Sequence, residues 1–502
     1  MGPPFIIAID SSTSSTKLEI YSLEGKSLHI GIKEHQILSP QSGWAENDPQ
    51  TTLDSLWELA AKAQESFNLS SAACIGITNQ RETVVAWQKS TGKVLYNAIL
   101  WCDARTTKIC EALIQKYAGD RNHFKHVTGL PISTYFTGFK IKWLLDNVPE
   151  VKAAHDADDV YFGTINTWIL WNLTGGEVFE TDSSNASRTF LMELRTCDYS
   201  ENMLSEFGIK RTSLPKIKPT FANFGVVKNP KSHCIGVEVH CMIGDQQAAT
   251  FGHGLLSPGL AKNTYGTGAF LMINTGSEVV ESAGLVSSVL YQVGSSAPVY
   301  CLEGAIECGG NVLNWLKDSI KLFDDFGKVN SEIPQTNGGV YFVPALGGLY
   351  SPYWENTAGS LLFGASLHTQ PAHIFRATLE GIAYRTKDCL EVLRNTSGTP
   401  IVLKELLVDG GLTRSQFLLE FQQKILSIPL KVTDNPNCTV LGAALGAGVS
   451  KGIIKLEDLP KFIANKTAVE LSGKWTLEEN YPLWQRLCRT SIELGSLKGA
   501  AE

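Results

Sequence analysis

Residues 5–25 of the chain read FIIAIDSSTSSTKLEIYSLEG, two apolar segments separated by a polar one. The first apolar run ends at Asp10, a stretch made almost entirely of Ser and Thr follows, and a strand-like segment resumes at Leu18. This layout is typical of two strands joined by a turn. Because Ser and Thr are common in turns, the hydroxyl-rich segment could simply close a β-hairpin. It could also bind a ligand, and the rest of the chain decides between these interpretations.

The same layout recurs in the second half of the chain. Residues 261–276, AKNTYGTGAFLMINTG, again place a Thr/Gly-containing turn between two strand-like segments. Residues 406–426, LLVDGGLTRSQFLLEFQQKIL, predict a buried strand, an Asp-Gly-Gly turn and a helix. The apolar positions of that helix recur at helical spacing and are Phe417, Leu418, Phe421 and Ile425. Glycine lets a backbone approach a ligand closely, and a helix N-terminus offers N–H groups to an anion. Three such loops indicate two similar domains that hold a phosphate chain between them, with a seam near residue 250.

Composition supports a large globular protein with an α/β fold. A chain of 502 residues is too long for one hydrophobic core, so two large domains are expected. Apolar strands alternate with amphipathic helices along the sequence, which indicates the α/β class. The formal charge is -7, and Lys and Arg form no block. Nucleic acid is therefore not an expected partner.

The cysteines and the apolar segments predict a cytoplasmic protein. Eleven cysteines are scattered along the chain without a CxxC pair or a Cys/His cluster, so we expect reduced and mostly buried thiols. The first residues, MGPPFIIAID, lack the basic region of a signal peptide. No apolar run approaches the length of about 18 residues that spans a bilayer. We expect no membrane segment.

The segment CMIGDQQAATFGHG (241–254) places an acid where an apolar strand ends. Asp245 follows directly on that strand and could act as a general base for a hydroxyl group. Gln246 could hydrogen-bond a neighbouring hydroxyl. Alternatively, Asp245 could simply cap the helix that follows. The segment alone favours the cap slightly.

A second polar group follows the strand in CIGITNQRETVVAW (74–87). Arg81 and Glu82 together offer hydrogen-bond donors and acceptors, which suits a polyhydroxylated substrate better than a simple anion. The alternative is an ion pair at the surface. Trp101 and Phe270 could cover the carbon face of such a substrate, although most aromatic residues at strand ends belong to the core.

These segments together resemble the FGGY family of carbohydrate kinases. The matching motifs follow one another in order from about residue 5 to residue 490: ITNQRET, YNAILW, GTINTWILWNLTGG, TDSSNASRT, GDQQAA, KNTYGTGAF and DGG. The combination of ITNQRET, GDQQAA and NTYGTG is specific within that family. The resemblance implies two ribonuclease-H-like domains of the actin/hexokinase/Hsp70 superfamily, with ATP and substrate in the cleft between them.

The resemblance also implies roles for individual residues. Asp245 would be the general base and would help Asp10 to hold Mg²⁺. The substrate would be bound by Arg81, Glu82, Trp101, Tyr135, Asp245, Gln246 and Phe270. ATP would be bound by Thr13, Ser14, Ser15, Lys17, Thr267, Gly310, Asn314, Gly411 and Ser415. The hydroxyl-rich turn is then a phosphate-binding hairpin.

The chain departs from the family pattern on the nucleotide side. Ser12 replaces a glycine of the first hairpin, which would cost roughly 1 kcal/mol if that position needs a positive φ. Lys17 stands where Arg is common, so a point charge replaces a bidentate fork. Ser415 and Asn314 replace amide side chains near the adenine. Glu307 replaces an apolar residue, and its carboxylate would be unfavourable near phosphates unless it is paired or faces away.

The resemblance implies ATP-dependent phosphorylation of glycerol to sn-glycerol 3-phosphate. We expect glycerol and phosphate to bind to an N-terminal domain of residues 1–252, and the nucleotide to a C-terminal domain of residues 253–502. The departures leave open a glycerol-binding protein with weak or no kinase activity. A kinase for another small polyol is a further alternative, although Trp101 and Phe270 leave little room beyond three carbons. A homodimer or higher homo-oligomer is also implied. Residues 226–239 lack the Gly-rich, Arg-bearing loop of bacterial relatives, so we expect no inhibition by fructose 1,6-bisphosphate.

Overall fold

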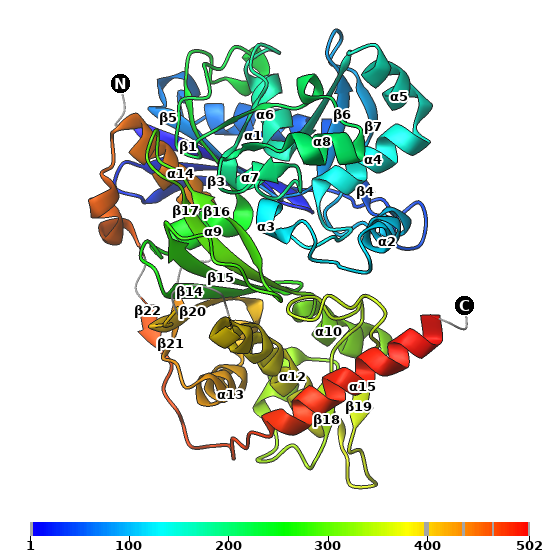
Figure 1. The fold of residues 1–502 in the computed structure, drawn as a ribbon. Coiled ribbons are helices and arrows are strands. Elements are labelled where there is room, and N and C mark those ends of the chain that lie inside the picture. The colour runs from blue at the N-terminus through cyan, green and yellow to red at the C-terminus, as the bar shows by residue number, and fades with distance from the viewer. Residues whose placement is uncertain (1–3, 396–400, 434–436, 464–465, 500–502) are drawn as a thin grey trace.

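The computed structural model describes residues 4–395, 401–433, 437–463 and 466–499. The first and second halves of the chain form two lobes, one above the other in Figure 1. Each lobe is built around a twisted sheet covered by helices, as expected for an α/β fold.

The sheet of the first lobe has the strand order β13-β5-β1-β2-β3. Strands β1, β2 and β3 form an antiparallel meander, whereas β5 and β13 run parallel to β1. The bounds are β1 Phe5–Ser11, β2 Ser15–Ser22, β3 Ser27–Glu34, β5 Cys74–Asn79 and β13 Val239–Gly244. The hydroxyl-rich segment thus joins two paired strands, which confirms the predicted hairpin.

The sheet of the second lobe repeats this topology. Its order is β16-β17-β15-β14-β20-β21-β22, in which β14, β15 and β17 form the meander and β20 and β21 run parallel to β14. The bounds are β14 Leu260–Tyr265, β15 Ala269–Gly276, β16 Val286–Tyr291, β17 Val299–Ile306, β20 Glu405–Gly410, β21 Leu430–Thr433 and β22 Lys466–Ala468. Two copies of one topology are the arrangement expected for two ribonuclease-H-like domains.

Smaller sheets lie outside these two cores. A sheet with the order β4-β7-β6-β8 extends the first lobe, and the remaining strands pair in twos. The bounds are β4 Glu46–Asn47, β6 Val84–Gln88, β7 Val94–Ile99, β8 Val160–Thr164, β9 Glu180–Asp182, β10 Met192–Glu193, β11 Asp198–Tyr199, β12 Lys216–Lys218, β18 Tyr341–Val343 and β19 Leu361–Phe363.

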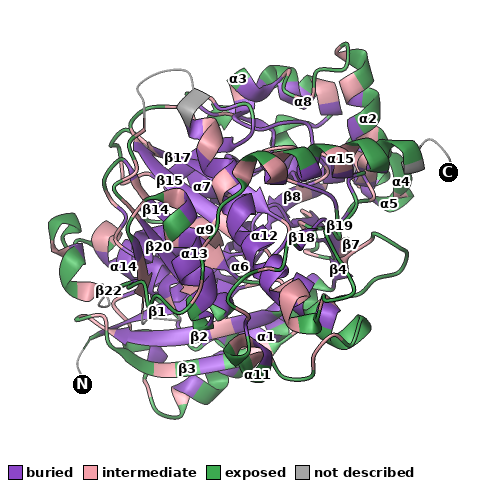
Figure 2. Cartoon of the chain, turned by 90° about the horizontal axis from the view of Figure 1, so that it is seen from below, coloured by how far each residue is buried: buried purple, intermediate pink, exposed green. Residues whose placement is uncertain are grey.

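Helices cover the faces of both large sheets. In Figure 2, α12 and α9 are almost entirely buried, whereas α15 exposes its outer side. The bounds are α1 Pro49–Gln64, α2 Thr107–Lys116, α3 Lys125–Thr128, α4 Thr137–Asn147, α5 Pro149–Asp156, α6 Ile165–Leu173, α7 Ser183–Ala186, α8 Glu201–Phe207, α9 Asp245–Gly252, α10 Gly310–Asn314, α11 Phe326–Ser331, α12 Pro371–Glu391, α13 Gln416–Leu426, α14 Cys438–Lys451 and α15 Tyr481–Gly499. Among the described residues, no helix combines the length and apolar character needed to cross a membrane.

Helix α14 connects the two lobes, although it lies late in the sequence. It packs against β1, β5 and β13 of the first lobe and against α9. Figure 1 shows this orange helix beside the blue strands of the N-terminal sheet. The contact is close because Gly442 lacks a side chain: a Cβ there would lie 1.9 Å from the Ala248 carbonyl oxygen. One apolar cluster accordingly contains Ile6 from β1, Met272 from β15 and Val440 from α14.

Candidate active site

The ends of three parallel strands bring the candidate residues of the first lobe together. In the register, Ser11 of β1 lies opposite Asn79 of β5, and Gly244 of β13 lies opposite the same residue. The loops that follow these strands therefore begin side by side. In the second lobe, Tyr265 of β14 lies opposite Gly410 of β20, so the two glycine-containing turns are neighbours as well.

The hydroxyl-rich turn accommodates Ser12 without backbone strain. The φ angle of Ser12 is not in the left-handed region, so the expected cost of a side chain at this position does not arise. Its N–H donates to the Ser15 carbonyl oxygen at 2.9 Å, and its hydroxyl donates to the same oxygen at 3.0 Å. The Ser15 hydroxyl lies 2.9 Å from the Ser12 hydroxyl, whereas Ser14 is exposed.

Asp10 is a buried carboxylate with unused hydrogen-bonding capacity. It is 4% exposed, and its Oδ1 atom is buried without a hydrogen-bond partner. Lys17 Nζ lies 3.8 Å from its Oδ2. Burial raises the pKa of Asp10 to about 7, and Asp245 adds to the rise whereas Lys17 opposes it. A cation bound here would satisfy the free oxygen.

Asp245 is the first residue of α9 and lies at the edge of solvent. The cap position belongs to Gly244, but the Gln246 N–H does donate to Asp245 Oδ1 at 2.7 Å. Arg81 Nε lies 3.1 Å from the same oxygen, and 29% of the Asp245 side chain remains exposed. Burial raises the pKa of Asp245, against the opposing charge of Arg81. A partly accessible carboxylate with a raised pKa is suited to accept a proton.

Arg81 and Glu82 are buried, so the alternative of a surface ion pair is wrong. They are 3% and 1% exposed. The backbone of Glu82 has a φ of 61°, an uncommon conformation for a residue with a side chain. Arg81 Nε lies 3.9 Å from Glu82 Oε1, and both side chains have closer partners. Arg81 pairs with Glu303 of β17, and Arg188 pairs with both glutamates.

Three aromatic rings form a wall beside these polar groups. The ring of Trp101 meets that of Tyr135 edge-on at 5.5 Å and that of Phe270 at 6.1 Å. Trp101 Nε1 donates to the Thr13 hydroxyl oxygen at 2.9 Å. Since Thr13 accepts this bond, its own O–H remains able to donate to an anion. The wall thus connects residues expected at the substrate with the hairpin expected at the phosphates.

Gln246 is held by a buried lysine. Lys262 Nζ donates to Gln246 Oε1 and to the Thr264 hydroxyl, both at 2.7 Å. Burial lowers the pKa of Lys262. Lys262, Arg188 and Glu303 were not among the site residues predicted from the sequence. A signal exists for Glu303, because it is the one charged residue in the largely apolar strand VYCLEGAI. Lys262 is followed by the polar residues Asn263 and Thr264, so its strand carries no comparable signal.

On the nucleotide side, two turns of the second lobe meet the start of α10. The Gly310 N–H donates to the Gly266 carbonyl oxygen at 2.9 Å, and the Asn311 N–H donates to the Thr267 carbonyl oxygen at 3.0 Å. Gly410, which precedes Gly411, has a φ of +91°, and a Cβ there would lie 2.2 Å from the Tyr265 carbonyl oxygen. No atom lies within 4 Å of a Cβ built on Gly411, so this backbone borders open space.

Ser415 and Asn314 differ from one another in accessibility. Ser415 is fully buried, caps α13 by accepting from the Leu418 N–H at 3.4 Å, and donates to Asn330 Oδ1 at 2.6 Å. Its hydroxyl is therefore occupied within the protein. Asn314, at the end of α10, is exposed.

Glu307 is paired rather than facing phosphates alone. Arg385 Nη2 lies 3.4 Å from its Oε2, which also accepts from the Tyr350 N–H at 2.9 Å. Burial raises the pKa of Glu307, and Arg385 opposes the rise. The carboxylate that departs from the family pattern is thus paired with the guanidinium of Arg385.

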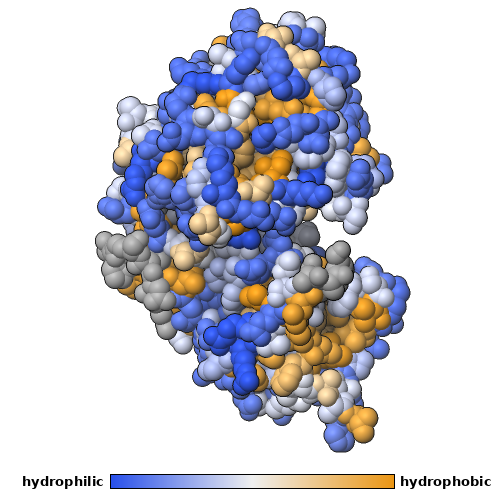
Figure 3. Space-filling model, turned by 45° about the vertical axis from the view of Figure 1, so that its right-hand side comes forward, coloured by the Kyte–Doolittle hydropathy of each residue, from blue (hydrophilic) through white to orange (hydrophobic). Residues whose placement is uncertain are grey.

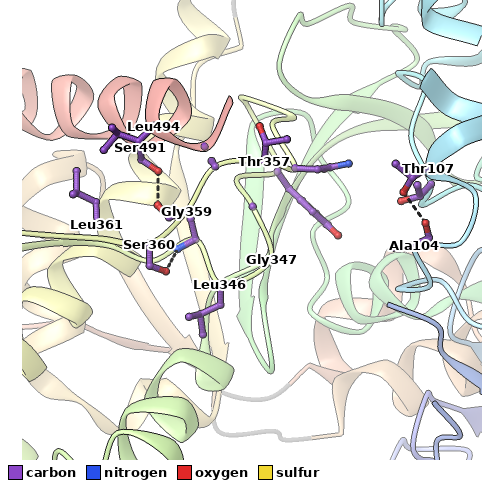
Figure 4. Close-up of a pocket in the computed structure, with 17 residues that line it drawn as sticks. Ala104, Thr107, Leu346, Gly347, Thr357, Gly359, Ser360, Leu361, Ser491 and Leu494 are labelled. Carbon is purple, nitrogen blue, oxygen red and sulfur yellow. Dashed lines mark hydrogen bonds between the residues drawn. The ribbon is translucent and has the colours of Figure 1, made fainter. Parts of the chain in front are cut away.

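A hollow separates the two lobes on the side away from α14, as the space-filling view shows (Figure 3). A cavity of about 730 Å³ is lined by residues of both lobes. Figure 4 shows Leu346 and Thr357 of the second lobe on one side and Ala104 and Thr107 of the first lobe on the other. The Ser491 hydroxyl donates to the Gly359 carbonyl oxygen at 2.6 Å and ties α15 to this wall.

Comparisons with known proteins agree with this arrangement. The model of the N-terminal domain of the FGGY family of carbohydrate kinases matches residues 5–252, and that of the C-terminal domain matches residues 261–450. The glycerol kinase of Acidiphilium cryptum is 40% identical over 500 residues, covering 97% of this chain and 99% of that protein. The glycerol kinase of Saccharopolyspora erythraea is 39% identical over 492 residues, covering 96% of this chain and 97% of that protein.

Solved structures give the same result for the fold. The crystal structure of Plasmodium falciparum glycerol kinase with ADP is similar at a TM-score of 0.86 and 36% identity, covering 99% of this chain and 98% of that chain. The ligand-bound xylulose kinase of Lactobacillus acidophilus has a TM-score of 0.83 at 21% identity, with 99% of both chains covered, and supports the fold alone. This two-domain fold is of the actin/hexokinase/Hsp70 type. The chain belongs to the FGGY family of carbohydrate kinases.

Proposed function

We propose that the protein is an ATP-dependent glycerol kinase that makes sn-glycerol 3-phosphate. The observation that carries this proposal is the convergence of Arg81, Glu82 and Asp245 beside a wall formed by Trp101 and Phe270. Hydrogen-bonding groups on one side and rings on the other suit a short carbon chain that bears several hydroxyls. The relatives at about 40% identity over nearly the whole chain are glycerol kinases, which agrees with this substrate.

The proposed roles are those that the family resemblance implies, and the position of Asp245 supports its own role. Asp245 takes the proton from the attacked hydroxyl, since its carboxylate is partly accessible and its pKa is raised. The remaining substrate contacts are assigned to Arg81, Glu82, Tyr135 and Gln246, with Trp101 and Phe270 against the carbon chain. Thr13, Ser14, Ser15 and Lys17 of the hairpin, together with Thr267, are assigned to the phosphates. Gly310, Asn314 and Gly411 are assigned to the adenosine pocket. Ser415, which was also predicted there, is fully buried and its hydroxyl bonds to Leu418 and Asn330, so it is left out of this assignment.

The residues present fit ATP and Mg²⁺. Asp10 offers a buried oxygen without a partner, and the backbone at Gly411 borders open space. Mg²⁺ usually binds one or two carboxylates together with phosphate oxygens and water, so Asp10 and Asp245 would hold it. When bound, it neutralises charge on the phosphates that react. The similar Plasmodium enzyme was solved with ADP.

The arrangement across two lobes has a consequence for catalysis. Asp245 begins α9 of the first lobe, whereas Thr267 lies in the turn after β14 of the second. Closure of the lobes would bring both sets of residues onto the substrates and exclude water, which would otherwise compete as the phosphoryl acceptor.

The test is the formation of ADP by the purified protein with Mg·ATP, with and without glycerol. We expect glycerol-dependent ADP release, and we expect Asp245→Asn to lower kcat by about 10²–10⁴-fold because a general base is lost. Near-normal turnover of this variant would refute the base assignment. The alternative of a glycerol-binding protein would instead give no ADP while glycerol still raises Tm. Release of ADP with another small polyol in preference to glycerol would favour the second alternative.

We further propose a homodimer or higher homo-oligomer in the cytoplasm. The location agrees with the scattered cysteines, most of which are buried, and the oligomer is implied by the family resemblance. The mass of the native particle in solution tests the oligomeric state.

A further inference from the structure

Four charged side chains form a closed ring beneath the substrate-binding group. Arg81, Glu82, Arg188 and Glu303 are each at most 3% exposed. Glu303 accepts from both terminal nitrogens of Arg81, at 2.5 Å and 3.0 Å. Its Oε1 also accepts from Arg188 Nη2 at 3.2 Å, and Arg188 Nε donates to Glu82 Oε1 at 2.5 Å. Arg81 and Glu82, which are assigned to glycerol, are thus held by Glu303 and Arg188, which are not.

Glu303 occupies the central place in this ring. It is the carboxylate shared by both arginines, and its two oxygens form a bidentate pair with Arg81, the strongest geometry available to these groups. Although burial opposes the effect, Arg188 and Arg81 lower the pKa of Glu303. The ring contains two positive and two negative charges, so removal of Glu303 would leave one buried cation uncompensated.

The pairing with Glu303 also determines which part of Arg81 is free. Both terminal nitrogens of Arg81 face Glu303, and Nη1 also donates to Gln247 Oε1 at 3.2 Å. The remaining donor, Nε, is buried without a hydrogen-bond partner in the described part of the chain, and it lies 3.1 Å from Asp245 Oδ1. A substrate hydroxyl beside Asp245 would supply the missing acceptor.

The strand register places Glu303 on the face of the second lobe that meets the site. Glu303 of β17 lies opposite Met272 of β15, two residues beyond Phe270. Residues directly opposite each other, and alternate residues along a strand, share one face of a sheet. Phe270 and Glu303 therefore approach the substrate group of the first lobe from the same face.

We infer that Glu303 is a positioning residue for the acceptor substrate: it holds the Arg81 fork so that Nε faces the substrate beside Asp245, and through Arg188 it holds Glu82. This inference rests on the proposed function, in which Arg81 and Glu82 bind glycerol. It assigns to β17 of the second lobe a part in acceptor binding. Glu303 itself does not touch the substrate.

The test is Glu303→Gln, which keeps the shape of the side chain and removes its charge. We expect KM for glycerol to rise about 10- to 100-fold, with KM for Mg·ATP within about twofold of the parent value. The increase in Tm that glycerol alone produces should shrink in parallel. A glycerol KM within twofold of the parent would overturn the inference. Glu303→Asp keeps the charge on a shorter side chain, so its glycerol KM should lie between those of the parent and of Glu303→Gln.

Glu380→Gln is the matched control. Glu380 is 3% exposed and accepts from Arg376 Nε at 2.7 Å within α12, so the same change again breaks a buried arginine pair. It should lower Tm and leave the glycerol KM unchanged. An equal rise in glycerol KM for both variants would mean a general loss of stability and would overturn the positioning role.

Two further outcomes remain decisive. If Glu303→Gln does not fold, the double variant Arg188→Gln/Glu303→Gln removes one charge of each sign, and its glycerol KM is expected to rise by a similar factor. An unchanged value would overturn the inference. If the parent protein forms no glycerol-dependent ADP, the proposed function fails. In that case the increase in Tm produced by glycerol is still measured for Glu303→Gln and for Glu380→Gln. An equal increase in the two variants would overturn the positioning role.

Discussion

Asp10 illustrates how burial determines the chemistry of a single side chain in this site. Its carboxylate lies at the end of a fully buried strand, with one oxygen unpartnered and Lys17 only at 3.8 Å. The pKa of Asp10 is about 7 in the folded protein and 3.8 in the unfolded chain. Between these two pH values the folded protein keeps a proton on Asp10 that the unfolded chain releases. The stabilisation present below pH 3.8 is therefore lost progressively as the pH rises to about 7.

We predict that Asp10→Asn raises Tm in Mg²⁺-free buffer, and that the gain over the parent grows from pH 5 to about pH 7 and is constant above it. The corresponding gain in the free energy of unfolding at pH 8 is about 1–3 kcal/mol, since the shift of about three pKa units sets an upper limit near 4 kcal/mol. The variant should lose at least about 100-fold in kcat, because its amide cannot help to hold Mg²⁺. Thermal unfolding followed by fluorescence across this pH range measures the effect.

The same substitution at exposed Asp54 of α1 is the control and should leave the pH dependence of Tm unchanged. A gain in Tm for Asp10→Asn that does not vary with pH would show that the Asp10 carboxylate is already ionised throughout the range.

At the scale of elements, the contact between α9 and α14 supports the helix that begins at Asp245. A Cβ built on Gly442 of α14 would lie 1.9 Å from the Ala248 carbonyl oxygen of α9. A Cβ built on Gly252 of α9 would lie 2.1 Å from the Cys438 carbonyl oxygen of α14. The part of α14 at this contact reads VLGAALGAG (440–448), and its small residues permit the close approach. Backbone atoms cannot move aside as a flexible side chain can, so a methyl group here must displace a whole helix.

We predict that Gly442→Ala lowers the free energy of unfolding by about 2–4 kcal/mol and lowers kcat as well, because α9 would shift with Asp245 at its first residue. Chemical denaturation and the ADP assay measure the two effects. Gly347→Ala is the control, since no atom lies within 4 Å of a Cβ built there and its backbone is not left-handed. Equal stability of the two variants would show that the helices separate at little cost.

At the scale of the whole molecule, the lobes are joined on one side and separated on the other. An apolar cluster with residues of β1, β15 and α14 joins them near α9, whereas the cavity of about 730 Å³ lies between α2 and the wall around Thr357. A protein joined at one side can close by rotation about that side. Substrate contacts from both lobes would favour the closed form.

We predict that glycerol together with Mg²⁺ and a non-hydrolysable ATP analogue reduces the radius of gyration measured by small-angle X-ray scattering. Glycerol alone should produce a smaller change, because it lacks the nucleotide contacts of the second lobe. Asp245→Asn serves as a control that retains most ligand contacts and should still contract. A radius of gyration that is unaffected by all ligands would show that the lobes do not close.

Local features of the sequence determined much of the fold and of the candidate site. The structure contains the hydroxyl-rich hairpin, the second hairpin at 261–276 and the strand-turn-helix at 406–426. These elements could be predicted because runs of apolar residues and the turn-forming residues between them act over only a few positions. The same holds for the position of Asp245 at a strand end. Motif order along the chain indicated the family without any knowledge of contacts.

Only the tertiary structure decided which charges meet. Arg81 and Glu303 are 222 positions apart in the sequence, and Glu307 finds Arg385 at a separation of 78. No period or turn motif encodes such pairs, since they depend on how two sheets and their helices pack. Local sequence therefore determined the elements and the reacting groups, whereas long-range packing determined how those groups are paired and held.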